Sequence, residues 1–321
     1  MNYMPSFLTR FMGAAKSGNR AAYLGILLKG LRPLTLILDS VLARKNAPYK
    51  HGTSLPPIVM IVSPPRSGST ITYQVLTRVI ASSYLSNLHF LFPKHASSFM
   101  SSKQLFGKNM TGFKNYYGYT AKIYDVNECN EIVEDFFKDG LYPIPIRANF
   151  LAFVQRMEIN KRMPIIFKNV RAYQNILSLH RAVPELIFLR IKRQTKMVIA
   201  SELKAHYELG TFHPMPPELE HVDKSDAVEF CVRQILAIEE SIDRQKKEID
   251  PQVWLEWTYE EFCQKPFDLI LRLIRDYLKL DRQVLRENAL PDNLKANVTP
   301  HFDETVMQKI ESLIHQYSAN E

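Results

Sequence analysis

Cysteine is scarce in this 321-residue chain, which has only three, and no CxxC pair occurs among them: Cys129, Cys231 and Cys263. Such wide spacing argues against a disulfide framework and against a zinc site. It is typical of a protein that works in a reducing compartment. We therefore expect a cytoplasmic protein that needs neither disulfides nor structural zinc.

Long apolar runs are also missing. A membrane-spanning helix needs about 18 or more residues with almost no charge. The nearest candidate covers residues 22–43, and four residues interrupt it: Lys29, Arg32, Pro33 and Asp39. No signal peptide with a small-residue cleavage site is evident. We expect no transmembrane helix.

What is present is an ordinary globular composition with a basic balance. The chain is 46% hydrophobic and 23% charged, so it can bury a core. Its net charge of +8 suits anionic partners such as nucleic acid, a membrane surface or small anions, although a basic surface also simply favours solubility. Composition alone does not decide among these partners.

Strand-like and helix-like segments alternate along the chain. Buried-strand runs of β-branched and aliphatic residues are followed by segments with helical spacing, which predicts βαβ units and an α/β fold with a mostly parallel sheet. The expected strands are residues 58–62, 163–167, 186–191 and 253–257. The expected helices include residues 69–81, 128–138, 173–182, 195–208, 227–247, 266–278 and 304–317. Residues 87–102 are expected to form a loop, and residues 103–125 an irregular wall over a ligand.

The chain divides into an N-terminal segment, residues 1–50, and a main domain, residues 55–321. Leu24, Leu27, Leu28 and Leu31 share one face of a predicted amphipathic helix, and basic residues accompany them. The pattern fits either a helix packed on the main domain or a helix lying on a membrane surface. Both interpretations stay open at this point.

One stretch, residues 58–80, is expected to organise the main domain. It reads as a strand, a tight loop (Ser63-Pro-Pro-Arg-Ser-Gly-Ser-Thr70) and a helix. Backbone amides and a helix N-terminus in such a loop favour an anion. The residues expected to bind it are Arg66, Ser67, Gly68, Ser69 and Thr70, with glycine allowing close approach of the backbone.

This loop is not the nucleoside-triphosphate loop G-x-x-x-x-G-K-[ST]. With Gly68 as the second glycine, position 63 should be glycine and position 69 lysine, but both are serine. No obvious carboxylate ends a strand to hold Mg²⁺. The cation of this loop, Arg66, precedes the glycine.

Pro64–Thr70, PPRSGST, closely resembles the 5′-phosphosulfate loop of the sulfotransferases that use 3′-phosphoadenosine 5′-phosphosulfate (PAPS), and is most similar to their carbohydrate and bacterial branches. Residues 183–201 are similar to the second cofactor segment of that family, in which an arginine and a serine eight residues later bind the 3′-phosphate. The resemblance implies that Arg193 and Ser201 do so here. Gln194-Thr195 departs from the usual Asn/Asp followed by Pro or Gly.

Two further segments extend the resemblance over residues 55 to 280. Lys168 occupies the place of a family lysine that touches the transferred sulfuryl group, although the proline usual after it is replaced by Val170. Tyr259-Glu260, with Pro266, looks like a late family segment near the cofactor. The resemblance implies a P-loop-like three-layer fold and roles for Lys168 and Arg66 in stabilising the transition state.

Sulfuryl transfer to a hydroxyl also needs a general base. In several branches of the family the base lies about twenty residues after the loop arginine, which makes His89 the first candidate. His95 is a second candidate, and the carboxylate alternatives are Glu128, Glu131 and Glu134. The sequence leaves this choice open.

The resulting hypothesis is a PAPS-dependent sulfotransferase that acts on a hydroxyl, with a sugar of a glycan or glycolipid as the favoured acceptor and 3′,5′-ADP as the spent cofactor. No metal and no nucleic acid are expected to take part, and the N-terminal helix is a candidate for peripheral membrane contact. The alternatives are a divergent P-loop kinase and a non-catalytic nucleotide-binding protein.

Overall fold

The computed structural model describes residues 19–42, 55–95, 115–157, 163–286 except 211 and 213, 289, 294 and 302–318. The ends of the predicted N-terminal segment and residues 103–114 of the predicted wall lie outside the described residues. The division into an N-terminal segment and a main domain stays a prediction.

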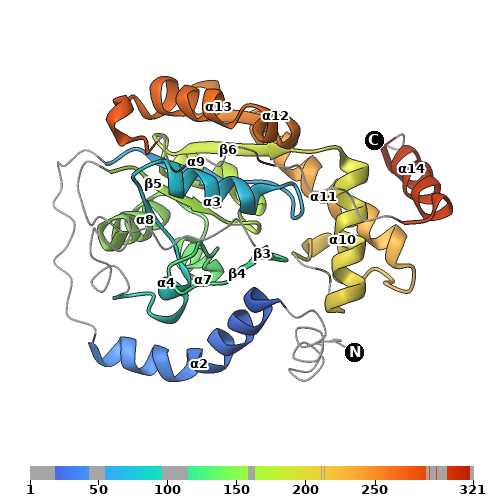
Figure 1. Cartoon of the computed structure of the whole chain (residues 1–321), viewed down its shortest axis with the longest axis horizontal. Coiled ribbons are helices and arrows are strands. Elements are labelled where there is room, and N and C mark those ends of the chain that lie inside the picture. Colours follow the sequence, from blue (N-terminus) through green and yellow to red (C-terminus); the bar gives the residue numbers. More distant parts are fainter. Residues whose placement is uncertain are drawn as a thin grey trace.

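A five-stranded parallel sheet forms the centre of the molecule, in the order β2-β5-β1-β6-β7 (Figure 1). Its strands are β1 (Ile58–Ile61), β2 (Ser83–Tyr84), β5 (Ile165–Lys168), β6 (Ile187–Lys192) and β7 (Trp254–Thr258). The central strand β1 pairs with β5 and β6, so that Met60 lies beside both Phe167 and Phe188. All four residues of β1 are buried, as expected for a parallel strand covered on both faces.

Helices cover both faces of the sheet, which gives the predicted three-layer α/β fold. Alternate residues of β1 point to opposite faces, with Met60 in one core and Val59 and Ile61 in the other. The first core is completed by α8 (Pro143–Met157), α9 (Ile176–Ala182) and α11 (Ala227–Lys246). The second is completed by α3 (Ser69–Val79), α12 (Tyr259–Gln264), α13 (Pro266–Arg272) and the π-helical turn η5 (Leu273–Leu278).

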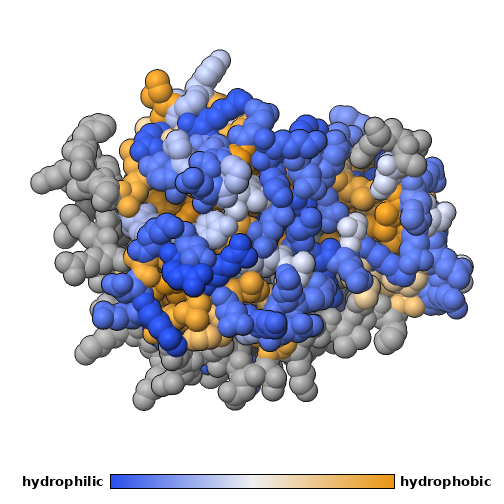
Figure 2. Space-filling view, turned by 90° about the horizontal axis from the view of Figure 1, so that it is seen from above, coloured by the Kyte–Doolittle hydropathy of each residue, from blue (hydrophilic) through white to orange (hydrophobic). Residues whose placement is uncertain are grey.

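The outer surface over α12 and α13 is mostly hydrophilic, with separate apolar patches (Figure 2). Beside the sheet, α11 packs with α10 (Thr195–Leu209) and α14 (Glu304–Ser318) around a third apolar cluster. The expected strands and the long helices are confirmed to within a few residues.

Several elements were not predicted. Residues 87–102 were expected to be a loop, but Asn87–Leu91 forms the short helix α4, because Ser86 and His89 make a capping box. Asn115–Tyr116 and Tyr119–Thr120 form a hairpin, β3 and β4, in place of an irregular segment. The helix α8 was missed entirely.

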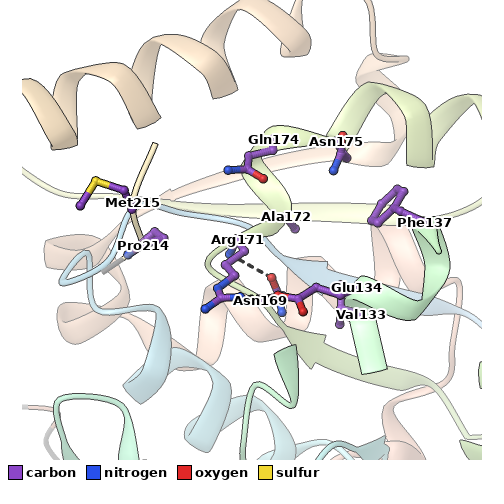
Figure 3. A pocket seen from close by; sticks show the side chains of 10 residues that line it. All are labelled: Val133, Glu134, Phe137, Asn169, Arg171, Ala172, Gln174, Asn175, Pro214 and Met215. Atoms are coloured by element: carbon purple, nitrogen blue, oxygen red, sulfur yellow. Dashed lines mark hydrogen bonds and ion pairs between the residues drawn. The ribbon is translucent and has the colours of Figure 1, made fainter. Parts of the chain in front are cut away.

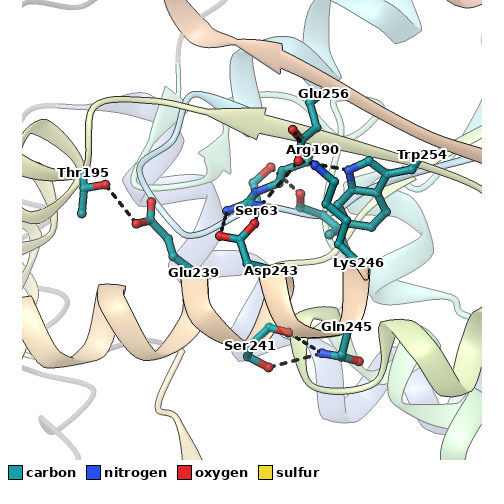
Figure 4. Close-up of polar contacts among 11 residues, drawn as sticks. Ser63, Arg190, Thr195, Glu239, Ser241, Asp243, Gln245, Lys246, Trp254 and Glu256 are labelled. Carbon is teal, nitrogen blue, oxygen red and sulfur yellow. Dashed lines mark hydrogen bonds and ion pairs between the residues drawn. The ribbon is translucent and has the colours of Figure 1, made fainter. Parts of the chain in front are cut away.

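A polar network on one face of the sheet fixes β6 against α11 (Figure 4). Arg190, almost fully buried on β6, pairs with Asp243 of α11 and lies 3.5 Å from a carboxylate oxygen of Glu256 on β7. The hydroxyl of Thr195, the first residue of α10, donates to Glu239 of α11 at 2.9 Å. These contacts fix the end of β6 and the start of α10, the two elements that flank Arg193.

The N-terminal helix α2 (Arg20–Leu42) lies along the opposite side of the molecule from α12 and α13 (Figure 1). By length and composition alone, Arg20–Val41 could cross a membrane, although its charges argued against this in the sequence. In the structure those charges have partners in the rest of the protein: Lys29, although exposed, bonds the hydroxyl of Tyr119, Arg32 pairs with Glu131, and Asp39 bonds His95. The side chains that α2 exposes are mainly apolar: Tyr23, Leu27, Leu31, Leu34, Ile37, Leu38 and Val41.

Candidate active site

Three neighbouring strands bring the predicted site residues to one edge of the sheet. The loop with Arg66 follows β1, Lys168 is the last residue of β5, and Arg193 follows β6 directly. Since β5, β1 and β6 are adjacent and parallel, their carboxyl ends lie at one edge of the sheet, where ligands usually bind in such folds.

The loop after β1 is built for close backbone approach. Gly68 has a φ of +94°, and a Cβ there would lie 2.2 Å from a ring carbon of Tyr259, so no other residue fits without displacing the ring. Ser67 is 1% exposed, and its hydroxyl has no hydrogen-bond partner among the residues that the structure describes. Ser69 and Thr70 open α3 immediately afterwards. A buried, unpaired hydroxyl beside a helix N-terminus fits an oxyanion ligand.

Arg66 and Arg193 meet at this loop. Arg66 has a left-handed backbone with a φ of +63°, and its Nε donates to the Ser201 hydroxyl at 3.4 Å. Arg193 Nη1 donates to the backbone carbonyl of Arg66 at 3.2 Å. The structure therefore brings together Arg66, Arg193 and Ser201, which lie far apart in sequence.

Aromatic rings support both arginines. The Arg66 guanidinium lies 4.7 Å from the centre of the Tyr117 ring, and that of Arg193 lies 4.8 Å from the centre of the Tyr259 ring. Burial lowers the pKa of Arg66, an effect that the carboxylate of Glu202 opposes. Two guanidinium groups at one buried loop create a demand for an anion.

Lys168 is 2% exposed, and its ammonium forms an ion pair with Glu128. The second carboxylate oxygen of Glu128 accepts the Val170 backbone N–H at 3.2 Å. Glu128 was one carboxylate alternative in the sequence, and it is the one that the structure joins to Lys168. An ionised carboxylate that is fixed in this way can accept a proton from a hydroxyl.

The turn of the β3–β4 hairpin lies over this pair. A Cβ on Gly118 would lie 3.9 Å from a carboxylate oxygen of Glu128, and the adjoining Tyr117 packs on Arg66. Burial and a hydrogen bond with Glu208 of α10 raise the pKa of Tyr117. Sequence reasoning missed Tyr117, although a glycine between tyrosines at 116–119 is a recognisable turn signal.

His89, the first candidate for the general base, is buried and contacts Ser86. It is 3% exposed, and its Nδ1 accepts the Ser86 backbone N–H at 3.2 Å and lies 2.9 Å from the Ser86 hydroxyl. Burial, with a smaller effect of Arg156, lowers the pKa of His89 to about 3. These contacts favour a role in capping α4.

The other candidates have partners away from the loop. Glu131 pairs with Arg32 of α2, Glu134 with Arg171, and His95 Nδ1 lies 2.9 Å from Asp39 of α2. Within the described part of the chain, no three His, Cys, Asp or Glu side chains are grouped so that they could hold a metal ion. All three cysteines are free.

The comparisons with known proteins agree with this architecture. The model of the Sulfotransferase family matches residues 57–283, more than half of the chain, and the chain therefore belongs to the sulfotransferase family. The protein is thus an enzyme of the sulfotransferase class. Among the curated protein sequences, none matches this chain.

Solved structures show the same fold. The sulfotransferase STF1 from Mycobacterium tuberculosis H37Rv is 11% identical with a TM-score of 0.55, over 92% of this chain and 83% of that one. The sulfotransferase STF9 from Mycobacterium avium is 12% identical with a TM-score of 0.55, over 84% of this chain and 78% of that one. At these identities the likeness concerns the fold alone.

The variant His89→Gln separates a capping role from a catalytic one. Glutamine can take the same place in a capping box, so we expect sulfuryl transfer to persist within about threefold and folding at pH 7 to be unchanged. The folded-state pKa of about 3 lies below the ordinary value of 6.5, so the unfolded chain binds the extra proton. Stability in the wild type is therefore lost as pH falls from 6.5 towards 3, by up to about 1.4 kcal/mol per pH unit.

Urea unfolding at pH 7, 5.5 and 4.5 measures this slope, which should be smaller in the variant. A loss of transfer of a hundredfold or more in His89→Gln, with 3′,5′-ADP binding intact, would instead identify His89 as the base.

Proposed function

We propose that this enzyme transfers a sulfuryl group from PAPS to a hydroxyl, with a sugar of a glycan or glycolipid as acceptor. The observation that carries the proposal is the Glu128–Lys168 ion pair at the strand ends that also hold Arg66 and Arg193. A proton acceptor then contacts the cationic side chain of Lys168 at the sheet edge that also carries Arg66 and Arg193, an arrangement that suits sulfuryl transfer to a hydroxyl.

The residues at the loop fit the two anionic groups of PAPS. Ser67, Ser69, Thr70 and the amides around Gly68 would hold the phosphosulfate, and the unpaired Ser67 hydroxyl supports this. Arg193 and Ser201 would hold the 3′-phosphate. When bound, PAPS supplies a sulfuryl group activated by a phosphate leaving group.

The side chains of this chain have separate tasks. Arg66 and Lys168 are fixed donors in a water-poor crevice, where they neutralise negative charge that develops during transfer. Glu128 accepts the proton of the acceptor hydroxyl at the carboxylate that Lys168 and the Val170 N–H orient. We assign the base to Glu128 because its partners, Lys168 and Val170, lie at the end of β5, next to the strand that leads into the loop, whereas His89 is engaged with Ser86.

The proposal includes peripheral contact with a cytoplasmic membrane surface through α2. Leu27 and Leu34 are 57% and 58% exposed on the apolar face of this helix. Arg32 and Asp39 of α2 are held by Glu131 and His95 of the domain, so α2 lies along the protein and offers its apolar side to lipid. The chain's net charge of +8 favours an anionic membrane, and a lipid-linked acceptor would be available there.

Calorimetry with 3′,5′-ADP tests the cofactor assignment. We expect tight binding without metal, weakened by at least about tenfold in Arg193→Ala because a charge-assisted hydrogen bond to phosphate is lost. Arg181→Ala, which removes an exposed ion pair with Glu248, is the matched control and should bind normally. A preference for ATP–Mg²⁺ over 3′,5′-ADP would contradict the proposal and favour a kinase.

Sedimentation with vesicles of phosphatidylglycerol and phosphatidylcholine tests the membrane contact. We expect the double variant Leu27→Glu/Leu34→Glu to bind at least tenfold less, because two apolar side chains lose their burial in lipid. Ile144→Glu is the control, since Ile144 is apolar and 85% exposed on α8. Equal binding by the wild type and the double variant, with both folded by circular dichroism, would refute the contact.

A further inference from the structure

A pocket of about 350 Å³ opens beside the strand end that carries Lys168 (Figure 3). Its size lies within the range of small-molecule sites, about 300 to 1,000 Å³. Its walls come from α7 (Asn130–Glu134), the turn η1 (Asp135–Phe137), the turn η2 (Ala172–Gln174) and the residues Pro214 and Met215. Of the residues in these elements, Glu131 and Glu134 of α7 were carboxylate alternatives for the base in the sequence.

Two chain segments connect this pocket to Glu128. Asn169 and Arg171 both line it, and the residue between them, Val170, donates its N–H to the Glu128 carboxylate. The helix α7 begins two residues after Glu128, and its last residue, Glu134, lines the pocket. The backbone N–H of Val170, between two residues of the pocket wall, is therefore hydrogen-bonded to the carboxylate that we assign as base.

The pocket combines amides with an apolar wall. Gln174 and Asn175 carry planar amides, while Phe137 and Met215 supply apolar surface (Figure 3). Asn175 stands at the N-cap of α9, yet its side chain makes no capping hydrogen bond. An asparagine in that position ordinarily caps the helix, so its amide is left for another partner.

Charge inside the pocket is balanced. Arg171 and Glu134 form an ion pair with each other (Figure 3). The two side chains therefore cancel, and the pocket offers no net charge for a charged ligand. The Gln174 amide already donates to the Tyr173 hydroxyl at 3.3 Å, so the Asn175 amide is the group that a purely apolar ligand would desolvate without giving it a partner. Amide donors and acceptors beside an aromatic ring suit a neutral ligand with several hydroxyls and an apolar face.

We infer that this pocket binds the acceptor, that it selects a neutral polyhydroxylated ring such as a hexose unit, and that Asn175 and the Arg171–Glu134 pair determine this selection. The inference rests on the proposed sulfuryl transfer. Glu128 does not itself line the pocket, so the hydroxyl to be sulfated would extend from a ligand seated there past the Asn169–Arg171 segment towards Glu128, while Phe137 contacts the apolar face of the ring.

The test uses full-length enzyme, PAPS and a panel of probes: methyl α-glucoside, methyl β-galactoside, methyl α-mannoside, methyl β-glucuronide and 2-naphthol. Initial rates give kcat and KM, and saturation-transfer NMR measures binding of each probe to the enzyme alone. In Asn175→Leu, KM for the best neutral glycoside should rise about tenfold, the effect of one lost hydrogen bond to a neutral group, with kcat and 3′,5′-ADP affinity within about twofold. Gln308→Met, on the exposed face of α14, is the control and should change nothing.

The variant Glu134→Gln tests the role of the ion pair independently, because it removes the negative charge that compensates Arg171. It should shift preference from the neutral glycosides towards methyl β-glucuronide. The inference is overturned if 2-naphthol is the preferred probe, if no glycoside binds, or if neither variant changes glycoside KM or binding while 3′,5′-ADP still binds. Failure of the wild type to bind 3′,5′-ADP or to use PAPS would instead reject the proposed function itself.

Discussion

The ion pair between Lys168 and Glu128 is the contact on which the site depends. It joins the end of β5, in the centre of the sheet, to the segment that leads into α7. Lys168 is buried, and a buried ammonium without a partner is strongly destabilising. The same contact that satisfies Lys168 therefore holds a carboxylate at the edge where the phosphate-type loop begins.

Two positively charged side chains, Arg66 and Arg193, lie close together at the loop after β1. The Arg193 guanidinium donates to the backbone of Arg66, and each arginine rests on a tyrosine ring. The ring faces and Glu202 offset positive charge at this loop. The proposed cofactor carries two anionic groups, which fit beside these two arginines.

Local motifs allowed much of this to be predicted from the sequence. The loop residues Arg66 to Thr70 lie in one strand–loop–helix unit, and Arg193 and Ser201 lie in another, so their spacing is visible in the chain. The contact on which the proposed choice of Glu128 over His89 rests was not visible in the sequence, because Lys168 lies forty positions away from Glu128. The sequence also did not reveal the partners of the charged residues on α2, because Tyr119, Glu131 and His95 come from later segments of the chain.

Single-turnover sulfuryl transfer in Glu128→Gln tests the central claim most directly. Glutamine keeps an oxygen for the Val170 N–H but cannot accept the hydroxyl proton, so the rate should fall by about 10²- to 10⁴-fold while 3′,5′-ADP affinity stays within about threefold. Glu131→Gln, three residues away in an ion pair with Arg32, should transfer at the wild-type rate. A Glu128→Gln enzyme that is folded, binds 3′,5′-ADP and still transfers at the wild-type rate would contradict the account.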